Sequence, residues 1–248
     1  MSKRREHADR IVTAIVMSSL VISIGYAIFH IATAPGESVN FEKVKGDYTL
    51  MLFQSIFGVI MMFFPSFLKK RWRITMPNLM HLIYVLFLYG AIYLGEVRNF
   101  YYTVPHWDTI LHTFSGGMLG AAGFSVVDIL NRDEKISMHL SPLFVAVFAF
   151  CFAISLGTLW EIYEFTGDSL LRMNMQKFML EDGTKLAGQA ALADTMKDLI
   201  VDACGAIIMT VIGYFSIRKN QHPFKVIEFD MEIAEPSEDK KKGEKIAF

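Results

Sequence analysis

The chain has 248 residues, 53% of them hydrophobic, and it contains 21 Phe and 15 Met residues. This apolar fraction is higher than that of ordinary soluble domains and predicts a membrane protein. The formal net charge is -1 and there are two cysteines. The composition therefore argues against a nucleic-acid partner and excludes a disulfide framework or a cysteine-based zinc site.

Six apolar segments are long enough to cross a membrane, which takes roughly 20 apolar residues for about 30 Å of hydrocarbon. The first follows a basic start, as a signal peptide would, but its length and Pro35 directly after a cleavage-like sequence favour a retained helix. We predict an all-α fold, a polytopic transmembrane helical bundle. Its predicted spans are residues 10–33, 48–68, 79–97, 108–130, 141–164 and 195–217.

The distribution of Lys and Arg predicts the orientation of the spans. Basic clusters flank the N-terminus, the connections after the second and fourth spans, and the tail, whereas the other connections carry few basic residues for their length. By the positive-inside rule, both termini are predicted to lie on the cytoplasmic side of a cell membrane. Residues 1–218 form the predicted membrane domain, and the Glu-, Asp-, Lys- and Pro-containing segment 219–248 is predicted to be a flexible cytoplasmic tail.

Ionisable residues stand at one end of the fourth and fifth predicted spans. Asp108 and His112 are one helical turn apart at the start of the fourth span and share a face. Asp108 would alternatively only cap the helix and meet water. Glu161 and Glu164 share a face near the end of the fifth span. A buried Glu161 is costly unless it is paired, protonated, solvated or bound to a cation, whereas Glu164 would alternatively only mark the interface.

The sixth span begins with three carboxylates on one face, Asp194, Asp198 and Asp202, at positions i, i+4 and i+8. They descend roughly 12 Å along the helix axis. The helix dipole favours acids in the first turn and explains Asp194. It does not explain Asp202, which lies about two turns inside the span.

These residues are predicted to form one polar layer, because the fourth and sixth spans start outside and the fifth ends outside. Carboxylates together with a histidine suit a divalent metal ion such as Mg, Mn or Zn. We predict the metal ligands to be His112, Glu161, Asp198 and Asp202, with Glu164 or Asp108 as the general base. A cationic clamp for phosphate is not obvious, and the nearest candidates are Arg98 and Arg172.

Three motifs carry a resemblance to known membrane proteins: Asp108-x-x-x-His112, Trp160-Glu161-x-x-Glu164, and Asp194-x-x-x-Asp198-x-x-x-Asp202 followed by Gly205. In these motifs the sequence resembles the bacterial inner-membrane protein family that includes YjdF, a family of unknown function. It is more loosely similar to the VanZ-like membrane proteins. Glu164 and Asp202 stand where VanZ-like chains are expected to carry amides, so this site is more acidic. Neither resemblance implies a reaction.

Three functions are compatible with this sequence. The first is a metal-dependent membrane enzyme, a hydrolase or transferase acting on a lipid-linked or cell-envelope substrate, with membrane lipid as its surroundings. The second is an ion-coupled transporter or permease in which the acids form a cation or proton path. The third is a non-catalytic membrane subunit whose polar layer fixes helix packing.

Overall fold

The computed structural model describes residues 3–34, 45–131, 140–171, 173–180, 184–219 and 230–231. Within these ranges, six helices are long and apolar enough to cross a membrane. The predicted all-α bundle with six spans is confirmed. The elements in chain order are α1 (Lys3–Thr33), α2 (Lys45–Met62), α3 (Phe64–Trp72), β1 (Ile74–Thr75), α4 (Asn78–Leu88), η1 (Tyr89–Val97), α5 (Phe100–Thr103), α6 (Trp107–Asn131), α7 (Pro142–Leu171), α8 (Gln189–Arg218) and β2 (Asp230–Met231).

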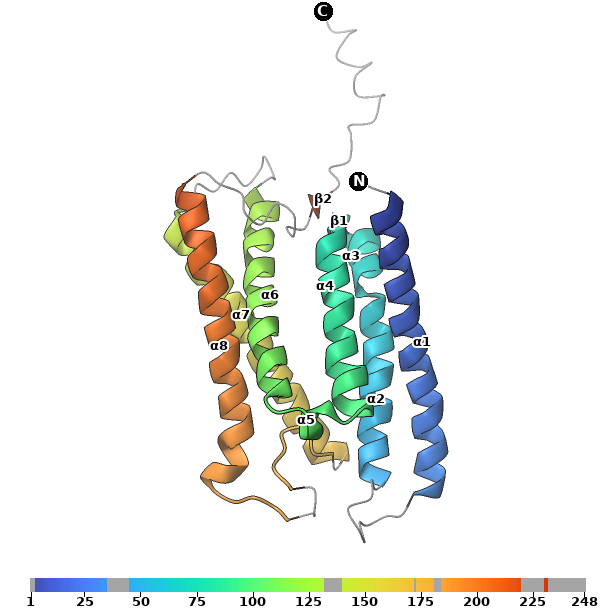
Figure 1. Cartoon of the computed structure of the whole chain (residues 1–248). Coiled ribbons are helices and arrows are strands. Elements are labelled where there is room, and N and C mark those ends of the chain that lie inside the picture. Colours follow the sequence, from blue (N-terminus) through green and yellow to red (C-terminus); the bar gives the residue numbers. More distant parts are fainter. Residues whose placement is uncertain are drawn as a thin grey trace, which may run out of the picture.

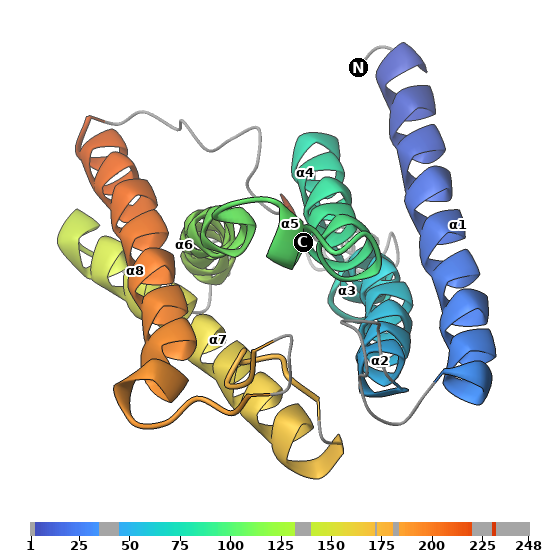
Figure 2. The same cartoon turned by 60° about the horizontal axis from the view of Figure 1, so that its bottom comes forward.

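The membrane helices pack as two groups, which lie side by side in Figures 1 and 2. The first group is α1, α2 with α3, and α4 with its π-helical continuation η1. Its core contains Leu20 of α1, Met62 of α2 and Val85 of α4. The second group is α6, α7 and α8, and its core contains Phe124 of α6 and Ala149 of α7. The candidate site belongs mainly to the second group.

Close packing of α6 against α8 depends on glycines. A Cβ added at Gly116 of α6 would overlap the backbone carbonyl of Asp202, and one added at Gly205 of α8 would overlap the backbone carbonyl of Thr113. Small residues allow two membrane helices to approach this closely. The approach brings the acidic face of α8 directly against the start of α6.

The helices that border the site are longer than their predicted spans. Helix α7 ends at Leu171, not at residue 164, and α8 begins at Gln189, not at residue 195. The sequence between residues 165 and 171 has no proline to stop the helix. The connection between the two helices is therefore shorter than the predicted residues 165–194, because both helices extend into it.

The N-terminal end of α1 and the C-terminal end of α8 lie at the same end of the bundle. Helix α1 begins, and α8 ends, at the upper end of the bundle in Figure 1. Strands β1 and β2 form a short antiparallel pair at this end, with Ile74 opposite Met231. The predicted flexible tail, apart from Lys219 and β2, lies outside the described residues.

Candidate functional site

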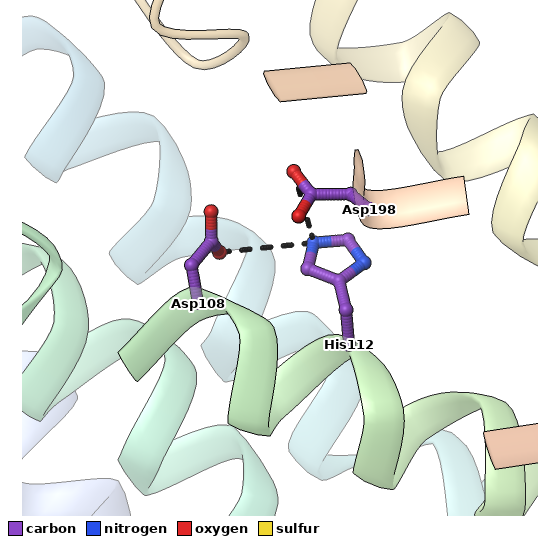
Figure 3. A group of neighbouring side chains, drawn as sticks. All are labelled: Asp108, His112 and Asp198. Atoms are coloured by element: carbon purple, nitrogen blue, oxygen red, sulfur yellow. Dashed lines mark ion pairs between the residues drawn. The ribbon is translucent and has the colours of Figure 1, made fainter. Parts of the chain in front are cut away.

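The centre of the site is His112, one helical turn inside α6. Its Nε2 atom lies 3.8 Å from Asp108 Oδ1 on the same helix and 3.9 Å from Asp198 Oδ2 on α8. Figure 3 shows both carboxylates directed at this nitrogen. One ligand atom from each of the three residues lies within 4.8 Å of the others, so the three could hold a metal ion. The Asp198 side chain is only 2% exposed.

The second ring nitrogen of His112 meets a different carboxylate. Nδ1 lies 3.3 Å from Asp202 Oδ2, and Asp202 Oδ1 lies 2.9 Å from the Ser115 hydroxyl. An ionised carboxylate only accepts hydrogen bonds, so an ionised Asp202 requires the proton on Nδ1. The neutral imidazole then keeps its Nε2 lone pair for a cation, as in carboxylate–histidine–metal arrangements.

Helix α7 supplies two buried glutamates with different surroundings. Glu164 is 8% exposed and accepts a hydrogen bond of 2.9 Å from Trp160 Nε1. Glu161 is 5% exposed, and neither of its carboxylate oxygens has a hydrogen-bond partner. The Thr195 hydroxyl is a neighbour of the Glu161 carboxylate but does not form a hydrogen bond with either of its oxygens. Glu164 therefore does more than mark an interface, and Glu161 is left with two free acceptor atoms.

Acids outnumber cations in this layer. Besides Glu96 of η1, which lines the adjacent cavity, the described part of the chain contributes six carboxylates, and the one ammonium group there that pairs with any of these six is that of Lys177. An ionised carboxylate in an apolar environment is costly without a partner. The layer consequently needs bound protons or a bound cation. Its carboxylates are Asp108, Glu161, Glu164, Asp194, Asp198 and Asp202.

Lys177 enters the site from the connection between α7 and α8. Its ammonium group pairs with Asp108 and lies 3.5 Å from an oxygen of Asp194. It also lies 5.3 Å from the ring centre of Tyr101. Burial lowers the pKa of Lys177, but Asp108 and Asp194 more than offset this and raise it above its usual value. The side chain therefore stays charged.

The backbone that carries Lys177 is held in place by several hydrogen bonds. The Asp168 carboxylate accepts bonds from the backbone amides of Met175 (2.7 Å) and Gln176 (3.0 Å). Gln176 Nε2 donates to the Thr195 hydroxyl on α8 at 2.8 Å. Lys177 itself adopts a φ of 46°, a left-handed conformation that is uncommon for a residue with a side chain. We call residues 173–180 the strap, since they fix the ammonium group over the acids.

The strap closes a small cavity beside the carboxylates. Its volume is about 40 Å³, and polar side chains from η1, α6, α7 and the strap line it. A cavity needs roughly 10–15 Å³ to hold one water molecule, so a few waters or a partly hydrated ion fit here. The polar lining includes Glu96, Tyr101, Asp108, His112, Glu164 and Lys177.

The structure gathers all six predicted site residues at the end of the bundle where α6 and α8 begin. The group with converging ligand atoms contains Asp108 together with His112 and Asp198. The roles of Glu161 and Asp202 as ligands, and of Glu164 or Asp108 as a base, stay predictions. Arg98 is exposed at the end of η1, and Arg172 lies outside the described residues.

Lys177 was missed as a site residue. The sequence shows it as one lysine in a polar connection, with no periodicity or motif around it. Its position depends on the turn of the strap and on the left-handed backbone. Asp168 was missed for the same reason, because its partners are backbone amides of the strap.

Comparisons with known proteins support a membrane protein without a known activity. A relative from Thermotoga maritima, named only as an uncharacterized protein, is 26% identical over 210 residues, which cover 82% of each chain. No solved structure matches the chain. A family model described as "Predicted membrane protein (DUF2238)" matches residues 11–219. The YjdF-like resemblance is consistent with this match, and the VanZ-like resemblance receives no support. The chain belongs to the DUF2238 family of multi-pass membrane proteins.

Proposed function

We propose that this protein is a divalent-metal-dependent membrane enzyme that acts on a lipid-linked or cell-envelope substrate. The observation that carries the proposal is the convergence of Asp108, His112 and Asp198 from two helices in a layer with excess buried acid. Two ligand atoms bound to one ion at roughly 2.1 Å lie at most about 4.2 Å apart. The two distances from His112 Nε2, 3.8 Å and 3.9 Å, are within that limit.

Each surrounding residue has a distinct role in this proposal. Asp202, supported by Ser115, orients the imidazole of His112 and holds the proton on Nδ1. Glu161, with two unpartnered oxygens, is available as a further ligand. A divalent ion at this place would supply polarisation of a phosphoryl or ester oxygen and acidify a bound water. Glu164 lines the cavity beside Asp108 and His112 and would accept the proton of that water.

Lys177 is the proposed clamp for an anionic group of the substrate. It is now paired with Asp108, which is also a proposed metal ligand. A metal ion that takes over part of the charge of Asp108 frees part of the ammonium charge for a phosphate or carboxylate. The sequence showed no obvious clamp, and Arg98 and Arg172 were only the nearest candidates for this role.

The proposed site faces the extracytoplasmic surface. The described basic residues after the second span, which include Lys69, Lys70 and Arg71, lie at the end of α3, opposite the site. The positive-inside rule favours the cytoplasm for that end. The substrate is therefore expected in the outer leaflet or in the envelope.

Metal titration of the detergent-purified protein tests the proposal. After chelation and dialysis, the wild type should bind one Mg, Mn or Zn ion per chain, and Asp198→Asn should lose that binding. Asp9→Asn is a matched control, since Asp9 pairs with a histidine at the opposite end of the bundle, Oδ1 to His81 Nδ1 at 3.0 Å. Binding in the control should equal that of the wild type.

The outcome also separates the three functions. A wild type that binds none of these metals overturns the enzyme mechanism. If protons then move with a solute in reconstituted vesicles and Asp198→Asn abolishes that movement, the site serves transport. If Asp198→Asn leaves every function intact and raises stability, the polar layer is structural.

A further inference from the structure

The end of the bundle opposite the candidate site carries a small surface built from β1 and the residues before it. Strand β1 follows α3 and pairs antiparallel with β2, a short part of the C-terminal tail. Strand β2 also contacts α6, so it lies between the two groups of helices (Figure 1). Two strands on their own are marginally stable at best in water. The pairing therefore depends on further interactions between the tail and this surface.

The chain is strongly basic where it enters β1. Residues 69–73 contain four cations and no acid. Lys70, Arg71 and Arg73 are exposed, and none of the three forms an ion pair with another described residue. Arg73 ends α3 in a left-handed conformation, with a φ of 58°, and turns the chain into the strand. The edge of β1 is thus accompanied by crowded positive charges that suit an anionic partner.

The tail has the complementary charge and the period of a strand. Residues 226–239 contain six acids and no Lys or Arg. Around β2, apolar and acidic residues alternate strictly: Ile227, Glu228, Phe229, Asp230, Met231, Glu232 and Ile233. Such alternation is typical of a strand with one apolar and one polar face. The sequence on both sides of β2 is therefore compatible with a longer strand.

The register of the β1–β2 pair matches acidic positions of the tail to polar and basic positions of the partner segment. Thr75 lies opposite Asp230. Continued by two residues, the same register would put Glu232 opposite Arg73. Opposite charges on directly opposite residues stabilise a strand pair, and like charges destabilise it. A register shifted by one residue would instead place an apolar residue opposite Arg73.

We propose that residues 229–233 of the tail dock as a β-strand on residues 72–76, with Glu232 paired to Arg73. A strand edge binds an extended segment through main-chain hydrogen bonds, which an anionic lipid does not provide in this pattern. The connection 219–229 spans at most about 40 Å, so it holds the acidic segment near the basic one at high effective concentration. Through β1 and α6, the docked strand links the two groups of helices.

Disulfide crosslinking in the full-length chain tests the proposal. Cys151 and Cys204 are first replaced by Ala, and the protein is reconstituted in phosphatidylcholine vesicles. Directly opposite residues have Cβ atoms about 4.5–5.5 Å apart, so Thr75→Cys combined with Asp230→Cys should oxidise readily to an intramolecular disulfide. Thr75→Cys combined with Met231→Cys is the matched control, because neighbouring strand positions face opposite sides. This control should lose most of the crosslinking.

A charge exchange tests the pair of Arg73 and Glu232 separately. With the cysteines of the first variant in place, Arg73→Glu should slow disulfide formation about two- to fivefold, the effect of losing one favourable cross-strand pair. Glu232→Arg should do the same, and the two changes together should restore the rate. Lys185→Glu removes an exposed cation from the connection before α8 and should leave the rate unchanged.

Three results would overturn the proposal. A tail that is not docked would oxidise the matched and the control cysteine pairs at similar rates. A charge exchange without rescue would show that the pair of opposite charges does not form. Loss of the disulfide when the vesicles contain phosphatidylglycerol would show that anionic lipid, and not the tail, occupies the basic segment.

Discussion

Replacing Lys177 by Met tests whether the strap neutralises the acidic layer. Methionine keeps an unbranched apolar side chain but removes the ammonium group. Asp108 and Asp194, whose side chains are 15% and 19% exposed, would then lose the cation that pairs with them. Leaving a buried charged group without its partner costs about 1–3 kcal/mol or more, so we expect a loss of that size in the free energy of unfolding.

A divalent metal ion should reverse this loss, because it supplies the missing positive charge. An ion that binds the folded state alone stabilises it by about 2.7 kcal/mol at 100 times its dissociation constant. The Lys177→Met variant should also bind the metal more tightly, since the ion no longer competes with an ammonium group for Asp108. Mn or Mg should therefore raise the unfolding midpoint of the variant more than that of the wild type.

The pH dependence of this effect follows from the pKa of Lys177. Its pKa is raised in the folded protein, so its contribution to stability is complete below the unfolded value of about 10.4 and is lost only as pH rises through the folded pKa. Titration of Lys177 itself should therefore add no pH dependence to the difference in stability between wild type and variant from about pH 6 to pH 9.

The assay is unfolding in detergent, followed by circular dichroism, with and without Mn. Lys185→Met is the matched control, because Lys185 is exposed on the connection before α8. Its effect should stay within about 0.5 kcal/mol, as for most surface substitutions. A Lys177→Met variant that is as stable as the wild type without metal, and that binds Mn no more tightly, would refute this account of the strap.

Two further predictions concern packing and titration. Gly205→Ala should destabilise the protein by about 1–3 kcal/mol, because the added Cβ would overlap the Thr113 carbonyl. Gly25→Ala, where a Cβ meets nothing within 4 Å, should be neutral or stabilising. Equal unfolding midpoints of the two variants in detergent would contradict this prediction. Burial, and next the nearby Asp108 carboxylate, raise the pKa of Tyr101 well above its usual value. Tyr101→Phe should therefore remove no phenolate absorbance near pH 10, where free tyrosine ionises, and a smaller absorbance change in the variant would contradict the raised pKa.

Much of the fold was predictable because the membrane imposes strong rules on sequence. Six apolar segments of sufficient length predict six helices, and the structure confirms that architecture. Helical periodicity also predicts that Asp108 and His112 share one face of α6, and the structure places them in contact range. The extra turns at the end of α7 and the start of α8 were not predicted, because both helices continue beyond the continuous apolar sequence from which the spans were predicted.

The details of the site depend on contacts that no single helix encodes. The sequence indicates that Asp198 and Asp202 share a face, but not that they meet opposite nitrogens of His112. That division follows from the glycine-mediated approach of α6 and α8. The position of Lys177 depends on a turn held by backbone hydrogen bonds to Asp168, which leaves no periodic trace in the sequence.

Pulsed electron paramagnetic resonance of bound Mn is the most direct measurement of the central claim, that His112 Nε2 and the carboxylates of α6 and α8 hold a divalent ion. In the wild type, the Mn signal should show coupling to one imidazole nitrogen. His112→Gln should abolish that coupling, and His81→Gln, at the opposite end of the bundle, should leave it unchanged. Mn that binds without nitrogen coupling, or coupling that survives in His112→Gln, would contradict the proposed metal site.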